Sequence, residues 1–563
     1  MEYENPPAES TIATQGIVVN RVFTKPETSV YDMFAYDLRT STIRNPDGSV
    51  VFDMKNVEVP KQWSQIATDI LAQKYFRKAG VPEVGSESSI KQVVHRMVGC
   101  WTDWGTKFGY FNSSKDSKAF YEEMAFILLN QMGAPNSPQW FNTGLNYAYG
   151  ITGNPQGHYY IDPKTGTLTQ SPDAYSRPQP HACFILSVRD DLVNEGGIFD
   201  LVTREARIFK YGSGVGTNFS SIRGKGETLS GGGSSSGLMS FLKINDTSAG
   251  SIKSGGTTRR AAKMVILDID HPEIESFIKW KASEEDKVAS LVAGSIVCKE
   301  HTNNILKAAN KHGLNLTENT KLRDAIRNAN NAKVPVQLIL RALELAKQGV
   351  GKLDMSEFDT HYEGEAYITV SGQNSNNSVR VNNDYMEALQ NNANWQLKNR
   401  TDGKLYKEVP AQKLWDDIAM SAWVSADPGL QFDSTINEWH TCPVSGRING
   451  SNPCSEYMFI DDTACNLASI NLDKFYDDET GTFNIEAYKH ATRLWTVALE
   501  ISVLMAQFPS KIVAKQSFDY RTLGLGYANI GSLLMKMGIA YDSDKGRAIA
   551  GALTSILCGE SYS

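Results

Sequence analysis

The sequence predicts an α/β fold preceded by a helical region. Between residues 136 and 300, short apolar runs alternate with stretches rich in Gly and Ser, a pattern typical of buried strands separated by helices. Over residues 60–132 and again over 301–350, apolar side chains recur three and four positions apart, which indicates helices with one buried face. A chain of 563 residues can form several domains, or one large α/β barrel that accounts for most of it.

The individual elements follow from local patterns. Helices are predicted at WSQIATDILAQKYF (63–76), FYEEMAFILLNQM (120–132), VPVQLILRALELAKQG (334–349), KLWDDIAMSAWVSA (413–426), 486–508 and 523–538. Buried strands are predicted at ACFILSV (182–188), MVILDI (264–269) and SLVAGSIV (290–297). Residues 1–20 are expected to be disordered, 21–132 to form the N-terminal helical region, and 133–563 to form the main α/β unit.

Composition excludes several classes of protein. The formal net charge of −7 gives no electrostatic case for binding polymeric nucleic acid. The apolar runs are too short or too interrupted to span a bilayer, so no membrane partner is expected, and the polar N-terminus does not look like a secretory signal. Seven cysteines without a CxxC pair argue against a disulfide framework or a structural zinc site and favour a reducing, cytoplasmic location. The nine histidines are scattered, so we expect no metal ligands among them.

Three glycine-rich stretches come close together, at YGSGVGTNFSSIRGKG (211–226), LSGGGSSSG (229–237) and SAGSIKSGGTTRR (248–260). Exposed backbone N–H groups beside cations suit phosphate binding. Flexible turns are the plainer interpretation, and the charged residues Lys253, Arg259 and Arg260 could also mark a solvated helix start. The pattern alone leaves these alternatives open.

The segment SNPCSEYMF (451–459) places Asn452, Cys454 and Glu456 two positions apart, so that they share one face if the segment is extended. A carboxylate raises the pKa of a nearby thiol, which disfavours a thiolate nucleophile. The arrangement suits a neutral thiol that exchanges hydrogen atoms, with the carboxylate as a base. Cys183 and Cys465 lie in apolar strand-like runs and, on composition alone, are core cysteines.

Taken together, six motifs identify a family. NSPQWFNTG (136–144), ACFILSV, the glycine-rich segment 212–241, the segment 249–281, NPCSEYMF and ACNLASINL (464–472) occur in one order. In this order they closely resemble the catalytic chain of class II ribonucleotide reductase, the adenosylcobalamin-dependent class. The similarity runs from about residue 20 to residue 563, without an additional ATP-cone-like segment at the N-terminus.

The resemblance implies a ten-stranded α/β barrel of two five-stranded halves, threaded by a finger loop, and a reaction that makes deoxyribonucleotides for DNA synthesis. Cys454 matches the thiyl radical position, Glu456 the carboxylate that takes the 3′-hydroxyl proton, and Asn452 the amide that holds the sugar hydroxyls. Cys183 and Cys465 match the reducing pair that ends as a disulfide, which replaces their interpretation as core cysteines.

Other residues are carried over by the same resemblance. The expected substrate contacts are Ser137, Ala182, Cys183, Ser220, Asn452, Pro453, Cys454, Ser455 and Glu456. The expected contacts to a deoxynucleotide or ATP effector are Asp190, Lys210, Arg223, Lys253 and Arg259, with loops 223–237 and 250–260 coupling effector to substrate choice. The family's effector site implies a homodimer, and its chemistry implies a thioredoxin-like reductant; diphosphate substrates are favoured.

The sequence departs from the family in one respect, because it lacks the later Pro-Thr-Gly phosphate loop and the terminal cysteine pair. We therefore expect a barrel without its C-terminal strands, which needs a complementary C-terminal chain and could be inactive alone. Two alternatives stay open: the large subunit of the di-iron class, and a non-catalytic nucleotide-binding remnant of the fold. The five intact catalytic positions count against the remnant.

Overall fold

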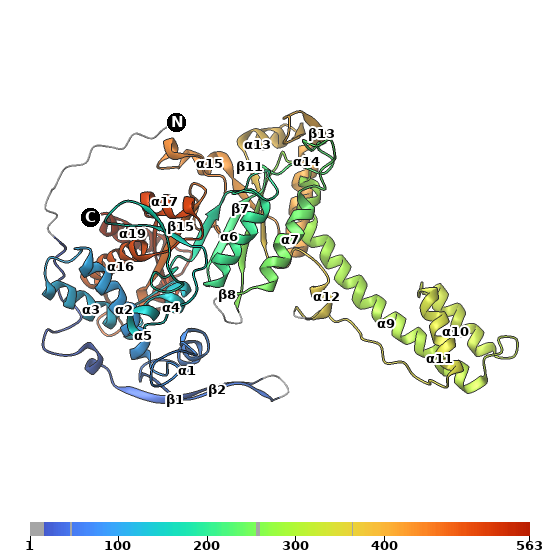
Figure 1. The fold of residues 1–563 in the computed structure, drawn as a ribbon, viewed down its shortest axis with the longest axis horizontal. Helices are drawn as coiled ribbons and strands as arrows, with labels where there is room; N and C mark the ends of the chain where they lie inside the picture. Colours follow the sequence, from blue (N-terminus) through green and yellow to red (C-terminus); the bar gives the residue numbers. More distant parts are fainter. Residues whose placement is uncertain (1–15, 45–47, 255–258, 363) are drawn as a thin grey trace.

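A computed structural model describes residues 16–44, 48–254, 259–362 and 364–563. Its centre is a curled sheet that includes β7, β11 and β15 (Figure 1). The strand order in this sheet is β14-β11-β10-β7-β6-β15-β18, with β3 beside β15. The strands are β3 (Gly133–Pro135), β6 (Cys183–Leu186), β7 (Gly214–Asn218), β10 (Ala262–Asp268), β11 (Asn376–Val381), β14 (Gly429–Phe432), β15 (Thr463–Asn471) and β18 (Leu523–Ala528).

The sheet consists of two sets of parallel strands, and the strands of one set run opposite to those of the other. Strands β6, β7, β10, β11 and β14 are parallel, β15 and β18 are parallel, and β15 runs antiparallel to β6. This arrangement confirms the expected barrel built from two halves, with β14 and β18 as its edges among the described strands. The strands predicted at 182–188 and 264–269 are β6 and β10, because fully buried apolar runs suit parallel strands that are covered on both faces.

Side chains alternate between the two faces of the sheet, as the two-residue period of a strand requires. On β6, Phe184 and Leu186 point outward into a core shared with the covering helices, whereas Cys183 and Ile185 face inward with Cys465 and Tyr457. The covering helices include α6 (Ile198–Lys210), α7 (Leu238–Ser251), α8 (Ile274–Ile278), α13 (Asn383–Gln390), α14 (Ala411–Ser425) and α17 (Lys511–Tyr520). The two cysteines therefore lie on the inner face of the sheet, while the outer face packs against the apolar sides of the helices.

A buried ion pair ties two covering helices to the sheet. Lys263 of β10 places its Nζ atom 2.6 Å from both carboxylate oxygens of Glu205 on α6 and 3.1 Å from the Asn245 side-chain oxygen on α7. Both charged side chains are almost fully buried. Removing one partner leaves the other charge buried without compensation.

We expect Lys263→Met to lower the free energy of unfolding by about 3–5 kcal/mol, since Glu205 would keep a buried negative charge. Urea unfolding followed by circular dichroism measures the loss. The matched control is Lys279→Met, because Lys279 pairs with Asp417 at the surface, where an ion pair contributes about 0–1 kcal/mol. Equal losses for the two variants would contradict the role given to Lys263.

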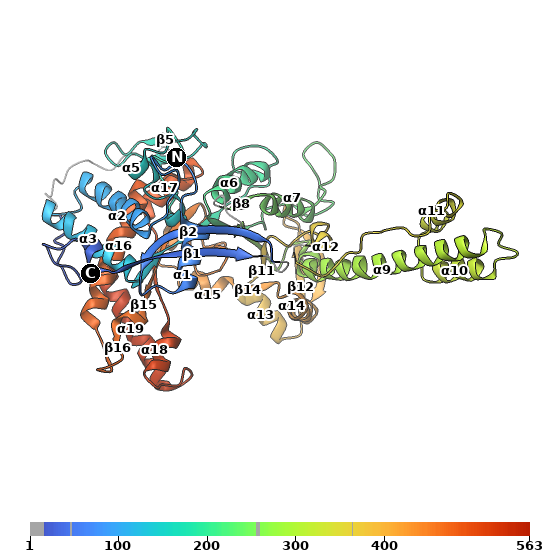
Figure 2. The same ribbon diagram turned by 90° about the horizontal axis from the view of Figure 1, so that it is seen from below.

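The N-terminal region differs from its prediction in containing strands. Helices α1 (Gln65–Ile70), α2 (Ile90–Lys107) and α3 (Ser114–Leu129), with a π-helical turn at Leu71–Tyr75, confirm the predicted helical segments. In front of them lies an antiparallel hairpin, β1 (Tyr36–Arg44) and β2 (Val50–Pro60), which is largely exposed (Figure 2). The helices share one core with α16 (Ile485–Met505) and α19 (Asp544–Tyr562), so this region packs on the second half of the sheet. Of the expected disordered segment 1–20, residues 1–15 lie outside the described residues.

Two predicted elements are wrong. The run 290–297 belongs to the long helix α9 (Trp280–His312), not to a strand; it sits in an arm that α9, α10 (Thr320–Asn331) and α11 (Val336–Lys347) extend away from the barrel (Figure 1). A short apolar run cannot distinguish helix from strand by period alone. The predicted helix 523–538 divides into β18 and α18 (Ile530–Lys536), because LGLGYA pairs with β15.

The remaining elements connect these parts. They are α4 (Ser137–Asn142), α5 (Leu145–Tyr149), β4 (Tyr159–Ile161), β5 (Leu168–Gln170), β8 (Lys253–Ser254), β9 (Arg259–Arg260), α12 (Glu365–Ile368), β12 (Asn394–Lys398), β13 (Leu405–Pro410), α15 (Asp433–Glu438), β16 (Tyr476–Asp477) and β17 (Thr482–Phe483), with single 3₁₀ turns at Val30–Met33, Pro443–Ser445 and Leu472–Phe475. No helix in the described part of the chain has the length and apolarity that a membrane crossing needs.

Candidate active site

The segment 446–459 crosses the inner face of the first half of the sheet. Side chains of three strands donate hydrogen bonds to it: Asn218 of β7 donates to the Asn449 carbonyl, and Asn376 of β11 donates to the Pro453 carbonyl. Gln431 of β14 donates to the Ser451 hydroxyl at 2.8 Å. The segment is therefore a loop fixed inside the sheet, which is where the finger loop was expected.

Glycines of β7 make room for this loop. A β-carbon at Gly216 would lie 1.7 Å from the Ser451 carbonyl oxygen, and one at Gly214 would lie 2.9 Å from the Pro453 ring. Atoms cannot approach so closely, so positions 214 and 216 on the inward face of β7 must lack side chains. The pattern GSGVG thus serves strand–loop packing at Gly214 and Gly216. Phosphate contact by the glycine-rich stretches stays a prediction.

The two cysteines that are 282 positions apart in sequence lie opposite each other. Cys183 of β6 and Cys465 of β15 are direct partners in the antiparallel ladder. Such partners have Cα atoms about 4.5–5.5 Å apart, within the 4.4–6.8 Å that a disulfide spans. Both are buried thiols in the structure. The register therefore allows the pair to close into a disulfide without movement of the strands.

Asn452 and Glu456 both reach the same cysteine. The Asn452 amide donates to the Cys183 sulfur at 3.0 Å, and the Cys183 thiol donates to a Glu456 carboxylate oxygen at 3.4 Å. The other end of the Asn452 amide accepts from the backbone N–H of Tyr457 at 3.0 Å, which fixes the turn of the loop. Asn452 is fully buried, whereas Cys454 and Glu456 are exposed. All five expected catalytic residues thus lie in one place.

Burial keeps the cysteine pair protonated. It raises the pKa of Cys465 from an ordinary 9.0 to about 12 and that of Cys183 well above its ordinary value, and the Glu456 carboxylate adds to both shifts. Because the folded state holds these protons more tightly than the unfolded chain, the pair's contribution to stability is present below pH 9 and is lost as the pH rises above it. A neutral dithiol is the form that can deliver both electrons and protons.

We expect iodoacetamide to modify exposed Cys558 readily at pH 8 while Cys183 and Cys465 react very slowly, because only the thiolate is nucleophilic. Between pH 8 and pH 10 the rate at Cys465 should rise about tenfold per pH unit, as expected for a group titrating near 12. Peptide mass spectrometry over a time course measures both rates. Modification of Cys465 as fast as Cys558 at pH 8 would contradict the protonated, buried pair.

The other residues predicted to contact the substrate lie in different parts of the structure. Ala182 precedes β6 and its carbonyl accepts from the Gly214 N–H, which places it beside Cys183. Ser137 begins α4 and its hydroxyl lies 3.0 Å from that of Tyr75. The Ser220 hydroxyl accepts from the Asp268 N–H at 2.7 Å, at the opposite end of β7 from Gly214. Pro453 and Ser455 flank Cys454 on the finger loop. Contact of these residues with a nucleotide stays a prediction.

The residues expected to bind the effector do not all lie together in the described structure. Arg223 pairs with Asp190 at 2.6 Å, whereas the Lys210 ammonium donates to Gln156 and Lys253 lines a separate cavity. The Arg259 side chain and residues 255–258 of the second loop lie outside the described residues. Helix α7 runs directly from loop 223–237 to loop 250–260.

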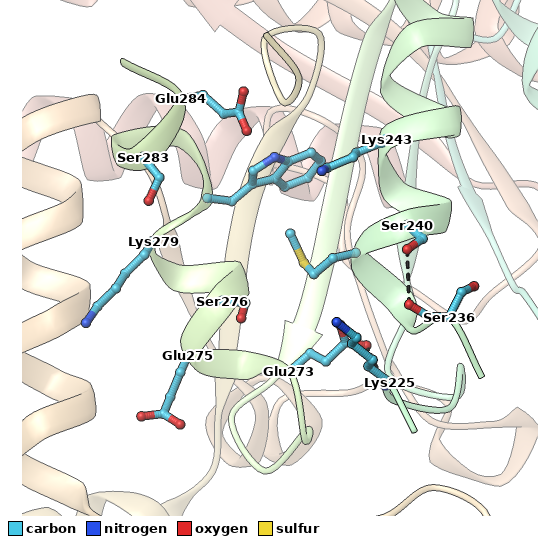
Figure 3. A pocket seen from close by; sticks show the side chains of 12 residues that line it. Lys225, Ser236, Ser240, Lys243, Glu273, Glu275, Ser276, Lys279, Ser283 and Glu284 are labelled. Carbon is cyan, nitrogen blue, oxygen red and sulfur yellow. Dashed lines mark hydrogen bonds between the residues drawn. The ribbon is translucent and has the colours of Figure 1, made fainter. Parts of the chain in front are cut away.

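Beside the first loop is a cavity of about 680 Å³ (Figure 3). Lys225 and Ser236 of the loop, Lys243 of α7 and Glu273 line it, and the Glu273 carboxylate accepts from the backbone N–H groups of Lys225 and Leu238. Glu273 thus fixes both ends of loop 223–237.

Sequence patterns missed several residues that hold the site. Tyr457 is a buried residue of the loop itself, and its hydroxyl contacts those of Thr463 and Thr522 at 2.8 and 3.1 Å. Asn376 and Gln431 fix the loop from β11 and β14. The only signal for them was the presence of polar residues in otherwise buried strands, which indicates a polar partner inside the barrel.

Comparison with known proteins decides the family. Residues 181–563 match the family model described as "Ribonucleotide reductase, barrel domain". The chain belongs to the ribonucleotide reductases. Residues 37–131 match "Class II vitamin B12-dependent ribonucleotide reductase", which places the chain in the class whose cofactor is adenosylcobalamin.

Curated relatives agree with this class. The chain is 55% identical to the vitamin B12-dependent ribonucleotide reductase of Agrobacterium fabrum and 56% identical to that of Bradyrhizobium diazoefficiens, each over 97% of this chain and 46% of the relative. It is 41% identical to the vitamin B12-dependent ribonucleotide reductase of Streptomyces coelicolor, over 99% of this chain and 48% of the relative. The chain thus spans about half the length of the relatives it matches.

Proposed function

We propose that this chain carries the radical and reducing centre of an adenosylcobalamin-dependent ribonucleotide reductase, acting on ribonucleoside diphosphates. The observation that carries the proposal is the convergence of Cys183, Cys465, Asn452 and Glu456 beside the loop that bears Cys454. A pure nucleotide binder has no need of this combination. The class match favours this function over the di-iron class.

One residue, Cys454, fits the chemistry that the cofactor supplies. Cys454 is exposed on the finger loop, as a thiol must be if a cofactor radical is to reach it. When bound, adenosylcobalamin supplies that radical by homolysis of its cobalt–carbon bond. The protein then has to position the substrate and exclude water.

The chain's own residues can perform the remaining steps. The Cys454 thiyl radical takes the 3′-hydrogen atom, Glu456 takes the 3′-hydroxyl proton, and Asn452 orients the sugar hydroxyls. The C2′–oxygen bond breaks, and the oxygen leaves as water with one proton from the cysteine pair. The second proton and the two electrons of Cys183 and Cys465 form the new C2′–hydrogen bond as the pair becomes a disulfide, and Glu456 returns its proton to the 3′-oxygen. Cys454 returns the hydrogen atom to C3′. The hydrogen bond between the Cys183 thiol and the Glu456 carboxylate offers a path for the proton that the leaving 2′-hydroxyl needs.

The proposed partners follow from the family. We expect a homodimer with deoxynucleotide or ATP effectors, and a thioredoxin-like protein that reduces the disulfide in the cytoplasm. We also propose that a complementary segment completes the barrel between β14 and β18 and supplies the substrate-phosphate loop. The two edge strands of the described sheet and the length of the relatives support it.

The test is an assay of the chain with ribonucleoside diphosphates, dithiothreitol and adenosylcobalamin, alone and together with a segment that supplies the remaining strands. We expect deoxynucleotides only when adenosylcobalamin is present, and efficient turnover only with the segment. Reduction without adenosylcobalamin would refute the proposed cofactor. Efficient turnover by the chain alone would refute the need for a complementary segment.

A further inference from the structure

The helical arm differs in charge from the rest of the chain. Residues 299–352, which contain the outer part of α9 together with α10 and α11, include ten Lys and Arg side chains but only four Asp and Glu. Their formal net charge is therefore +6, and the rest of the chain carries −13, since the total is −7. The sum over the whole chain conceals this difference, so the exclusion of polymeric nucleic acid on that sum does not extend to the arm.

The arm projects from the barrel in both views of the structure (Figure 1, Figure 2). Helix α9 has 33 residues, and a rise of about 1.5 Å per residue places its outer end about 45 Å from its start. Charges in solution are screened over about 8 Å at physiological ionic strength, so the acidic body does not cancel the positive field at the outer end. The arm also has a small hydrophobic core of its own, which includes Ile305, Leu322 and Ile339.

Most of the arm's cations have no acidic partner. Lys299, Arg327 and Lys347 form ion pairs. No carboxylate in the described part of the chain lies within 4.0 Å of the charged nitrogens of six further exposed cations, Lys307, Lys311, Lys321, Arg323, Lys333 and Arg341. Lys307 and Lys311 are four positions apart, as are Arg323 and Arg327, and like charges at this spacing destabilise a helix. The charge therefore opposes folding of the arm, which indicates that it serves the binding of an anion.

The other side chains of the arm distinguish between kinds of anionic partner. Residues 299–352 contain no Phe, Tyr or Trp. Protein interfaces depend on Trp, Tyr and Arg and are depleted in Lys, and single-stranded nucleic acids are bound by stacking of their bases on aromatic rings. Exposed Asn304, Asn328, Asn330 and Asn331 instead add amide groups beside the cations. Lys, Arg and Asn are side chains that contact the phosphates of a double helix.

We propose that the outer part of the arm, residues 299–352, binds the phosphate backbone of double-stranded DNA without reading its sequence. The major groove of B-DNA admits an α-helix, whereas that of double-stranded RNA is deep and narrow. Such binding holds the protein on the polymer whose precursors its family makes. The inference does not rest on the chemistry of the cysteine site, so each can fail without the other.

The proposal is tested by fluorescence anisotropy of a labelled DNA duplex of about 30 base pairs, titrated with the full chain between about 50 and 200 mM NaCl. If each of the six unpaired cations neutralises one phosphate, the slope of log affinity against log salt concentration is about −5. In the variant Lys307→Gln/Lys311→Gln/Lys321→Gln/Arg323→Gln we expect a slope of about −2 and an affinity at low salt that is lower by about 100-fold or more.

The matched control removes four exposed lysines from the body of the protein, in Lys25→Gln/Lys55→Gln/Lys115→Gln/Lys545→Gln. It changes the net charge by the same amount and should leave the affinity and the slope unchanged. The variant Lys307→Arg/Lys311→Arg/Lys321→Arg keeps the charges and should bind like the unsubstituted chain. This second variant distinguishes the loss of charge from damage to the helices.

Absence of duplex binding at low salt would overturn the proposal, and so would an equal loss of affinity in the body control. Tighter binding of a single strand or of an RNA duplex would contradict the choice of double-stranded DNA. Competition by polyglutamate as strong as by unlabelled duplex, at equal charge, would assign the arm to an acidic protein surface instead. The Cys454→Ala variant should bind the duplex like the unsubstituted chain, so that failure of this inference and failure of the reductase activity are distinguishable.

Discussion

We expect Cys454→Ala to reduce ribonucleotide reduction by at least about 10⁴-fold, because no other described side chain at the tip of the finger loop can hold the radical. Nucleotide binding should remain within about twofold of the unsubstituted chain. Cys454 is exposed, so its sulfur makes little contribution to the core and the variant should fold normally. Product formation is measured by chromatography of labelled nucleotides, and binding by equilibrium dialysis.

A matched variant separates the radical role from the mere loss of a thiol. Cys442→Ala removes a half-buried cysteine outside the segment that bears the site, and it should leave turnover unchanged. Persistent reduction in Cys454→Ala would show that the radical resides elsewhere. Joint loss of turnover and binding would show that the substitution had damaged the fold of the loop.

The second large effect is expected at Gly216. In Gly216→Ala the new methyl group would lie 1.7 Å from the Ser451 carbonyl oxygen, so either β7 or the finger loop must move. Forcing an additional carbon into a packed interior costs about 1–3 kcal/mol, and a misplacement of about 1 Å at a reacting group costs on the order of 10²-fold in rate. We therefore expect both a lower free energy of unfolding and a loss of turnover of about 10²-fold or more.

The control is Gly526→Ala, another glycine within a strand of the same sheet. A β-carbon at Gly526 meets no atom within 4 Å, and its backbone conformation is open to any residue. This variant should change neither unfolding nor turnover appreciably. Equal behaviour of the two variants in urea unfolding and in the reductase assay would show that the close approach of Gly216 to Ser451 is unimportant.

The candidate site was largely predictable because its chemistry lies in contiguous motifs. Asn452, Cys454 and Glu456 come from one short segment, and the structure brings this segment to Cys183 as the family resemblance implied. The pairing of Cys183 with Cys465 depends on the register of two strands far apart in sequence, which no local pattern contains. The role of Gly214 and Gly216 could not be predicted from sequence for the same reason, since only the folded chain shows which atoms approach them.

The fold was predictable where burial and period agree. Strands β6 and β10 are continuous apolar runs, and α3 and α16 have regular buried faces. The strand predicted at 290–297 was wrong because these small and apolar residues lie within the long helix α9 of the arm, so their apolarity does not reflect burial in a sheet. The hairpin β1–β2 was missed because burial alternates along β1 but apolarity does not: the less exposed positions carry the polar Arg39 and Ser41, whereas Leu38 is exposed.

The most direct test of the account is a single turnover without external reductant, in the presence of adenosylcobalamin and the segment that completes the barrel. The account predicts about one deoxynucleotide per active site and, by peptide mass spectrometry, a new disulfide between Cys183 and Cys465. Omission of the ribonucleotide should leave both thiols reduced. Deoxynucleotide formation with Cys183 and Cys465 still reduced would contradict the account, because the electrons would then come from another source.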